Sequence, residues 1–160
     1  MKYVLRTPLP HHHAELGGWI SDAEQCLRWA GPALAFPFDS QMLPALLETE
    51  VCDSYALVDE DDRLAGFGQI FRREPETGHL GRIIIDPQRR KQGVGQILCK
   101  ELIDAGAHRH GFRSMTLWVF TDNSAAVRLY SALGFLPEAR EGMAGCQFMR
   151  LSFAVPDGAD

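Results

Sequence analysis

The stretch Arg89-Arg-Lys-Gln-Gly-Val-Gly95 follows the apolar run Ile83-Ile-Ile85 and the turn Asp86-Pro87, and it opens a predicted helix. Backbone N–H groups in the first turn of a helix have no intrahelical partner, and the helix dipole adds partial positive charge there. The two glycines have no side chains, so a ligand can approach the backbone closely. Three cationic side chains precede them. The stretch therefore predicts a binding site for a phosphate.

The spacing of the glycines disfavours two common phosphate-binding folds. The chain contains no Gly-x-x-x-x-Gly-Lys-Ser/Thr and no Gly-x-Gly-x-x-Gly, which are the motifs of P-loop NTPases and of dinucleotide-binding domains. The pattern here is Arg90-x-x-Gly93-x-Gly95. It resembles the pyrophosphate-binding signature of the GNAT superfamily of acyl-CoA-dependent N-acyltransferases. Taken alone, it also fits a glycine-bearing loop with solvated basic residues.

A second segment, Asn123-x-x-Ala126-x-x-x-Tyr130-x-x-x-Gly134-Phe135, is similar to the segment that lines the coenzyme A thiol in GNAT enzymes. It follows the glycine stretch with a predicted strand between them, as in that family. The segment also has a local explanation, because asparagine is a good N-cap and glycine suits the left-handed position after a helix. Tyr130 is then either a site residue or a core tyrosine with a bonded hydroxyl. With both segments in this order, the chain is identified by resemblance as a GNAT protein.

Composition sets limits on the class of protein. The chain has 160 residues, of which 46% are hydrophobic, and a formal net charge of −5. This length suits one domain, and the net negative charge disfavours a nucleic-acid partner. The apolar runs are far shorter than the roughly 20 residues of a membrane span, so no membrane partner is expected. The N-terminal residues do not resemble a signal peptide, so a cytoplasmic location is expected.

Cysteine and histidine give no metal pattern. The four cysteines, at positions 26, 52, 99 and 146, form no Cys-x-x-Cys pair. Reduced thiols are expected, and Cys99 is expected to pack within a helix rather than act as a nucleophile. Three adjacent histidines, His11-His-His13, cannot all face one ion from regular structure. We interpret them as a solvated loop and expect no metal site.

The hydrophobic periodicity predicts a mixed α/β fold with the order β-αα-βββ-α-β-α-ββ. Ser21-Asp-Ala-Glu24 is a capping box that begins a helix, and Asp39 or Ser40 caps the next. We expect strands at residues 2–6, 55–58, 64–71, 79–85, 115–120, 136–140 and 147–153, and helices at 22–30, 41–48, 93–110 and from 123. The order matches the GNAT fold, a central mixed sheet flanked by helices. We therefore expect one domain over residues 1–153 and a frayed tail over 154–160.

The resemblance implies acetyl-CoA as co-substrate, with no metal. In GNAT folds two parallel strands splay apart and the pantetheine arm enters between them. Here these would be residues 82–85 and 115–119. Carried over residue by residue, the coenzyme site comprises Ile83, Ile84, Ile85, Arg90, Lys91, Gln92, Gly93, Val94, Gly95, Asn123, Ala126 and Tyr130.

The resemblance also implies catalytic roles. Tyr130 is the candidate acid for the departing thiolate, because a tyrosine of ordinary pKa, about 10, is protonated at neutral pH. A backbone N–H near Ile83 to Ile85 would meet the oxyanion. Asn123 would orient the pantetheine or cap the helix. His79 falls near the place where some GNAT enzymes carry a basic glutamate, so it is either the base, directly or through water, or a histidine at a strand end. Glu76 is a lesser candidate.

The amine acceptor is open at this stage. In this family the first two helices and the final hairpin set specificity, and here they carry aromatic residues. Trp29, Phe36 and Phe38 are the substrate-binding candidates, although core packing also explains them. A small amine, an amino acid, an antibiotic and a peptide or protein N-terminus all remain as acceptors, and a homodimer is compatible with the family. The alternative function is a non-catalytic acyl-CoA-binding sensor on the same fold.

Overall fold

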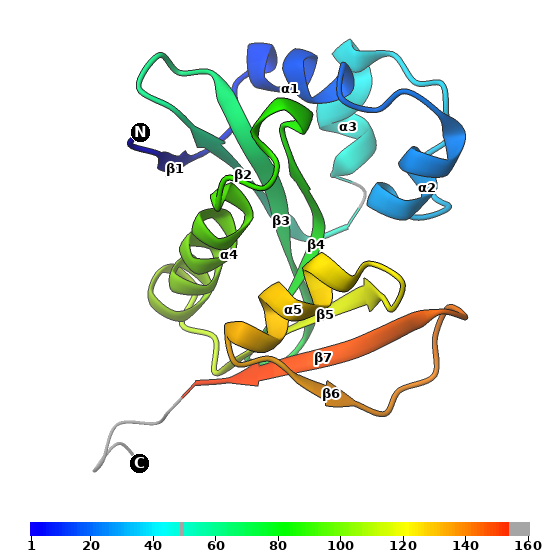
Figure 1. The fold of residues 1–160 in the computed structure, drawn as a ribbon, viewed down its shortest axis with the longest axis vertical. Helices are drawn as coiled ribbons and strands as arrows, with labels where there is room; N and C mark the ends of the chain where they lie inside the picture. The colour runs from blue at the N-terminus through cyan, green and yellow to red at the C-terminus, as the bar shows by residue number, and fades with distance from the viewer. Residues whose placement is uncertain (49, 154–160) are drawn as a thin grey trace.

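The computed structural model of the chain describes residues 1–48 and 50–153. Within those ranges the chain forms one seven-stranded sheet and five α-helices (Figure 1). The strands are β1 (Val4–Arg6), β2 (Cys52–Val58), β3 (Leu64–Glu74), β4 (Thr77–Ile85), β5 (Ser114–Phe120), β6 (Leu136–Glu138) and β7 (Cys146–Ser152). The α-helices are α1 (Pro10–Gly17), α2 (Ala23–Ala30), α3 (Leu43–Leu47), α4 (Val94–Asp104) and α5 (Ser124–Ala132). Short 3-10 turns, η1 (Ser40–Met42) and η2 (Pro87–Arg89), precede α3 and α4, and a π-helical turn, η3 (Ala105–Arg109), follows α4.

The sheet has the strand order β1-β2-β3-β4-β5-β7-β6, and only the β4–β5 pair is parallel. That pairing joins Thr77–Leu80 to Ser114–Leu117 and, within the described part of both strands, stops there. The remaining residues of β4 and β5 therefore separate, and α4 and α5 lie on either side of the place where they do (Figure 1). The predicted mixed sheet with splayed parallel strands is confirmed.

A bulge in β4 lies at the point of separation. Gln69 of β3 pairs with Gly81, and Phe67 pairs with Ile84, so β4 has one residue more than β3 in this interval. Arg82, inside the bulge, has a φ of 50°, which a residue with a side chain rarely adopts. A bulge of this kind turns the local backbone groups out of the regular ladder. The bulge thus frees β4 backbone groups beside the gap.

The sheet separates two apolar cores. Leu57 of β2 belongs to a core with Leu98 and Leu102 of α4, whereas its neighbours Ala56 and Val58 belong to a core with residues of α1 to α3. Successive side chains of a strand point to opposite faces, which explains the alternation. Both faces of the central strands are therefore buried, one under α4 and the other under α1 to α3.

The N-terminal helix α1 corrects the sequence analysis. We interpreted His11 to His13 as a solvated loop, but they lie in α1, and His12 and His13 are buried. Proline stands at the first position of the helix, where its missing N–H costs nothing. His12 Nδ1 accepts the backbone N–H of Leu9 at 2.9 Å, the part that a glutamate or glutamine takes in a capping box. The order therefore has three helices, not two, before the central strands.

Other predicted boundaries differ by a few residues. Asp22, not Ser21, is the N-cap of α2, and its carboxylate accepts the N–H of Gln25 at 2.8 Å. The helix predicted to end at residue 110 changes from α to π geometry after Asp104. The strand predicted over 136–140 ends at Glu138. The predicted frayed tail, 154–160, lies outside the described residues.

Candidate functional site: two adjoining cavities

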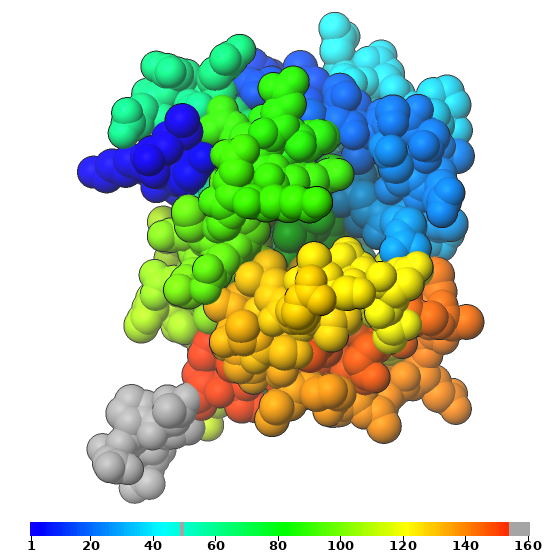
Figure 2. Space-filling model, viewed as in Figure 1, coloured from blue at the N-terminus to red at the C-terminus, as the bar shows by residue number. Residues whose placement is uncertain are grey.

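The larger of two adjoining cavities has a volume of about 720 Å³ and is lined by residues of α2, β4, α4 and α5. Figure 2 shows it as a hollow between the green start of α4, the yellow α5 and the blue α2. Ten of the twelve residues predicted to bind the coenzyme line it: Ile83, Ile84, Ile85, Arg90, Lys91, Gly93, Gly95, Asn123, Ala126 and Tyr130. The volume is in the range of small-molecule and cofactor sites.

Gln92 and Val94 do not line this cavity. The Val94 side chain is buried in the core beneath α4, and Gln92 is exposed, with its amide donating to the carbonyl of Gln88. The cavity includes lining residues that the sequence analysis did not predict, among them Gln96, Cys99, Ala125 and Leu129. Burial raises the pKa of the Cys99 thiol to about 12, so it packs in the wall as an inert group, as expected.

The start of α4 carries the groups that suit a phosphate. Gly93 is the N-cap, with a φ of 81° that a side chain would oppose, and a Cβ there would meet no atom within 4 Å. The first backbone N–H bonded within the helix is that of Ile97, so the preceding N–H groups have no helical partner. Arg90 and Lys91 line the cavity and form no ion pair with any described residue. These groups fit the pyrophosphate of coenzyme A.

Arg89 differs from its two cationic neighbours. Its guanidinium donates to Asp59 at 2.7 Å and to Asp86 at 3.3 Å, and the hydrogen bond to Asp59 raises the pKa of the guanidinium above its ordinary value. The Asp59 side chain is only 7% exposed. Arg89 thus stabilises the turn before α4, and two cations rather than three are available to a ligand.

Tyr130, on α5, lines the larger cavity. Its side chain is 8% exposed, and its ring packs edge to face on Phe135 at 5.9 Å. No group of the described residues forms a hydrogen bond with its hydroxyl, and burial raises its pKa above the ordinary value. The hydroxyl is therefore protonated at neutral pH and is a donor without a partner. Asn123 Oδ1 accepts the N–H of Ala126 at 3.2 Å, so Asn123 caps α5.

The smaller cavity, of about 210 Å³, adjoins the larger one. Arg28 and Trp29 line both cavities. The smaller cavity is lined by β4 residues that directly precede Ile83, and by residues of α2, β3, β5 and the loop before β7: Leu27, Arg28, Trp29, Ala30, Gly31, Phe71, Arg73, His79, Leu80, Gly81, Arg82, Trp118, Phe120, Met143 and Cys146. Two cavities that share a wall beside the β4 bulge can hold two reactants next to each other.

His79 lines the smaller cavity, not the larger one. Its side chain is 7% exposed, stacks on Phe148 at 6.2 Å, and bonds through Nδ1 to Thr116 Oγ1 at 2.8 Å. Burial lowers its pKa to about 4, so the imidazole is neutral at pH 7 and only weakly basic. Glu76, the lesser candidate, lies in the turn before β4, pairs with Arg113 at 3.6 Å, and lines neither cavity.

The aromatic substrate candidates are divided by the structure. Trp29 lines both cavities, and its indole N–H donates to the carbonyl of Arg82 at 2.9 Å, which fixes α2 to the β4 bulge. Phe36 and Phe38 pack on each other at 6.1 Å and against the core under α1 to α3, and line neither cavity. Arg82 was not predicted as a site residue. A single arginine within the apolar run from Leu80 to Ile85 is the signal that could have found it.

One cluster has a metal-like composition, namely His11, His12 and Asp62. The two Nε2 atoms lie 3.0 and 3.2 Å from the Asp62 carboxylate, which also accepts from Arg6 at 3.0 Å. Because His12 Nδ1 accepts the N–H of Leu9, Nε2 of the neutral ring carries the proton and donates it to Asp62. A protonated Nε2 and an arginine on the same carboxylate do not suit a metal ion. The cluster instead ties α1 to the β2–β3 turn.

The acetyltransferase (GNAT) family model matches residues 23–135. The chain belongs to this family. The match spans α2 to the end of α5, and so includes both cavities' β4 wall and the start of α4. The family predicted from the two sequence segments is thus confirmed.

Relatives with known names are acetyltransferases of several kinds. The [ribosomal protein bS18]-alanine N-acetyltransferase of Salmonella typhimurium is 37% identical over 75 residues, which are 47% of this chain and 49% of that protein. The mycothiol acetyltransferase of Mycobacterium avium is 34% identical over 132 residues, 78% of this chain and 38% of that protein. The chain thus matches half or less of the length of these two relatives.

The fold matches solved GNAT structures. The structure of spermidine N-acetyltransferase from Vibrio cholerae in complex with CoA and spermine superposes with a TM-score of 0.77 and 16% identity, over 94% of this chain and 95% of that one. At this identity the similarity concerns the fold alone. Among the described residues, no helix has the length and apolar character to cross a membrane.

Proposed function

We propose that this chain transfers an acetyl group from acetyl-CoA to a primary amine by direct attack within a ternary complex. The observation that supports this most strongly is the pair of adjoining cavities that share Arg28 and Trp29 beside the β4 bulge. The larger cavity has the groups for a pyrophosphate at the start of α4 and a buried tyrosine on α5. The smaller one is open to a second reactant.

The chain's own groups would bind and position acetyl-CoA, whose thioester supplies an acyl group that needs little activation. Arg90, Lys91 and the N–H groups at the start of α4 would hold the phosphates. Ile84 and Ile85 pair with β3, but the edge of Ile83–Ile85 toward β5, beyond the last β4–β5 pair, would be free to pair with the amides of the pantetheine arm. Placement of two reactants in line supplies most of the rate enhancement in such a reaction.

The reaction needs two hydrogen-bond donors, one for the carbonyl oxygen and one for the departing sulfur. The amine nitrogen bonds to the acetyl carbon as the carbon–sulfur bond breaks, so the amine loses a proton and the sulfur gains one. A backbone N–H at the β4 bulge, near Ile83, would donate to the carbonyl oxygen as its negative charge develops. The Tyr130 hydroxyl, which has no partner in the described residues, would donate to the departing sulfur.

The weak basicity of His79 limits how the amine loses its proton. With a pKa of about 4, His79 takes a proton from an α-ammonium of pKa about 7.8 at a cost of about 5 kcal/mol, and from a lysine ammonium of pKa about 10.4 at about 9 kcal/mol. We therefore propose that the acceptor binds as the free amine. His79 would then accept a hydrogen bond at Nε2, directly or through water. The proton that the amine loses would return through solvent to the Tyr130 oxygen, which has given its own proton to the sulfur.

A non-catalytic acyl-CoA-binding module is the second candidate. It is favoured by the lack of any carboxylate among the described residues that line the smaller cavity, which leaves no strong base there. Such a module would bind CoA in the same larger cavity but would have no use for the Tyr130 hydroxyl.

Thiol release from acetyl-CoA, measured with a panel of amines, amino acids and short peptides, separates the two candidates. We expect acceptor-dependent release, and Tyr130→Phe should lower kcat about 100-fold while CoA binding is retained. Tyr55→Phe is the matched control, because Tyr55 is also buried but lines neither cavity and bonds His110 at 2.7 Å. CoA binding by calorimetry without release in any mixture would favour the binding module.

A further inference from the structure

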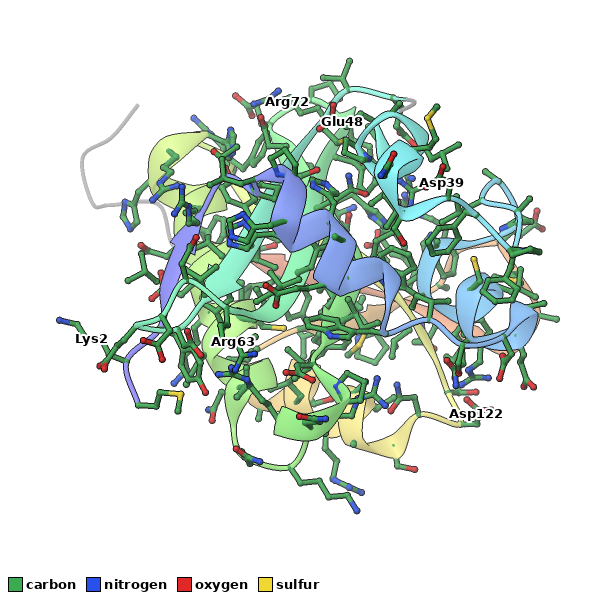
Figure 3. The ribbon with its side chains drawn as sticks, turned by 90° about the horizontal axis from the view of Figure 1, so that it is seen from above. Lys2, Asp39, Glu48, Arg63, Arg72 and Asp122 are labelled. Carbon is green, nitrogen blue, oxygen red and sulfur yellow. The ribbon has the colours of Figure 1, made fainter. Side chains whose placement is uncertain are left out.

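The smaller cavity contains three arginines, and two of them have carboxylate partners. Arg28 donates to both oxygens of Asp122, at 2.6 and 3.2 Å, and Figure 3 shows Asp122 at the edge of α2. Arg73 donates to both oxygens of Glu50, at 3.0 and 3.1 Å. Since each of these carboxylates is engaged through both oxygens, neither of them forms an ion pair with the third arginine.

Arg82, the third arginine, is held entirely by neutral acceptors. Its Nη1 donates to the carbonyl of Leu47 at 2.9 Å and to Gln69 Oε1 at 3.0 Å, and its Nε points to the carbonyl of Ala30 at 3.4 Å. No carboxylate of the described residues lies within 4 Å of it. Its Nη2 makes no hydrogen bond to the described residues and remains accessible to solvent. Arg82 is thus a fixed cation with two N–H donors to spare.

The surroundings make this charge effective. Burial lowers the pKa of the Arg82 guanidinium, yet an arginine stays charged in a protein. The other walls of the cavity are mainly aromatic, including Phe71, Trp118 and Phe120, and His79 is neutral. In such surroundings a charge is poorly screened, and a planar guanidinium matches a carboxylate in geometry.

We propose that Arg82 binds a carboxylate of the acceptor, and that the acceptor is therefore a small amine with a carboxylate and an apolar side chain, such as an α-amino acid. This assignment rests on the proposed acetyl transfer and names its substrate class. A polyamine would bring further positive charge to a cavity that has three arginines, one of them without a carboxylate in contact, and no carboxylate in its described lining. The same cation would favour the free-amine form of the acceptor.

The test compares acceptors that differ only in the carboxylate. Thiol release is measured with phenylalanine, methionine and leucine, with their amides, with the corresponding decarboxylated amines, and with spermidine. In the wild-type protein we expect kcat/KM to be at least tenfold higher for the best amino acid than for its decarboxylated amine. In Arg82→Met this ratio should fall to within about twofold of one, because the amino acid loses much more activity than its decarboxylated amine. An amino acid and its decarboxylated amine also differ in the pKa of the amine. This difference is the same for both proteins, so it does not affect the change in the ratio between wild type and Arg82→Met.

Two further variants control for loss of structure in Arg82→Met. Arg82→Lys keeps the charge and should keep much of the preference. Arg72→Met removes an arginine of the neighbouring strand β3 that lines neither cavity, and it should leave the ratio unchanged. Spermidine or a decarboxylated amine as the best acceptor would overturn the assignment and leave the acetyl transfer intact.

If no amine is acetylated, the proposed function fails, and calorimetry with N-acetylphenylalanine and N-acetylphenethylamine then tests Arg82. Tighter binding of the carboxylate, lost in Arg82→Met, would support the role, and equal binding would overturn it.

Discussion

The two cavities share a wall but are assembled from the chain in different ways. Most of the larger cavity comes from two continuous segments, residues 83–96 and 123–130, with part of α2 closing it. The smaller cavity takes short pieces from α2, β3, β4, β5 and the loop before β7. In the larger cavity the backbone itself supplies the phosphate-binding groups, whereas in the smaller one side chains supply nearly all of the chemistry.

This difference has a consequence for specificity. Free N–H groups at a helix start depend on a glycine conformation, so that part of the site changes little with the identity of surrounding side chains. The smaller cavity depends on which arginines have carboxylate partners and which aromatics form its walls. Substitutions should therefore affect coenzyme binding mainly through the backbone of the start of α4, and acceptor choice mainly through side-chain charge.

The largest effect is expected at Gly93. In Gly93→Glu a residue with a side chain must adopt a backbone φ of 81°, which is strained, and its carboxylate would repel the phosphates of CoA. Affinity for CoA should therefore fall by at least about 100-fold. Gly111→Glu is the matched control, because Gly111 also has a positive φ, 68°, and open space around it, but lines neither cavity. Calorimetry with CoA measures both. Equal losses in the two variants would attribute the effect to backbone strain, and intact binding in Gly93→Glu would refute the assignment of the loop.

The neighbouring arginines allow a sharper division within the larger cavity. Arg89→Met should lower the free energy of unfolding by about 2 kcal/mol, because it removes the cationic partner of the Asp59 carboxylate and leaves it only the backbone N–H groups of Asp61 and Arg63. It should change CoA affinity little. Arg90→Met should weaken CoA binding about five- to tenfold and leave the free energy of unfolding unchanged. Chemical denaturation and calorimetry measure the two quantities. A stable Arg89→Met protein with weakened CoA binding would mean that Arg89, too, serves the ligand.

The same division explains what could be predicted from the sequence. Ten of the twelve predicted coenzyme-site residues line the larger cavity. They could be predicted because the glycine stretch and the Asn123 segment are each continuous in the sequence and resemble GNAT motifs there. Arg82 was missed because its importance depends on Glu50 and Asp122 being engaged elsewhere, and no local pattern reveals a partner. Helix α1 was missed because its capping group is a histidine rather than the usual glutamate. Phe36 and Phe38 were candidates because the resemblance gives their region a role in specificity, but they pack on each other, as the alternative of core packing allowed.

A pH experiment examines the smaller cavity without an acceptor. The pKa of His79 is about 4 in the folded protein and about 6.5 when unfolded, so the unfolded chain binds more protons between these values. Protonation of His79 in the unfolded chain therefore lowers the free energy of unfolding as the pH falls from 6.5 toward 4, by about 2 to 3 kcal/mol at pH 4.5. In His79→Gln the free energy of unfolding should depend less on pH in this window. His108→Gln, at a histidine whose side chain is 77% exposed, should leave the slope as in wild type. An unchanged slope in His79→Gln would mean that its imidazole is not buried as described.

The smallest effect is expected at the shared wall. Trp29→Phe keeps an aromatic ring against Phe67 but removes the indole N–H that bonds the carbonyl of Arg82. One hydrogen bond of this kind contributes about 1 kcal/mol, so kcat should fall about fivefold, with the KM for acetyl-CoA nearly unchanged. Trp118→Phe controls for lost indole volume, because Trp118 lines only the smaller cavity and its indole bonds no described residue. A selective change in the amino acid to amine ratio in Trp29→Phe would show that the bulge positions Arg82. A fall in kcat with every acceptor would show that it positions the backbone N–H of Ile83, and so would assign the shared wall to the chemistry rather than to acceptor choice.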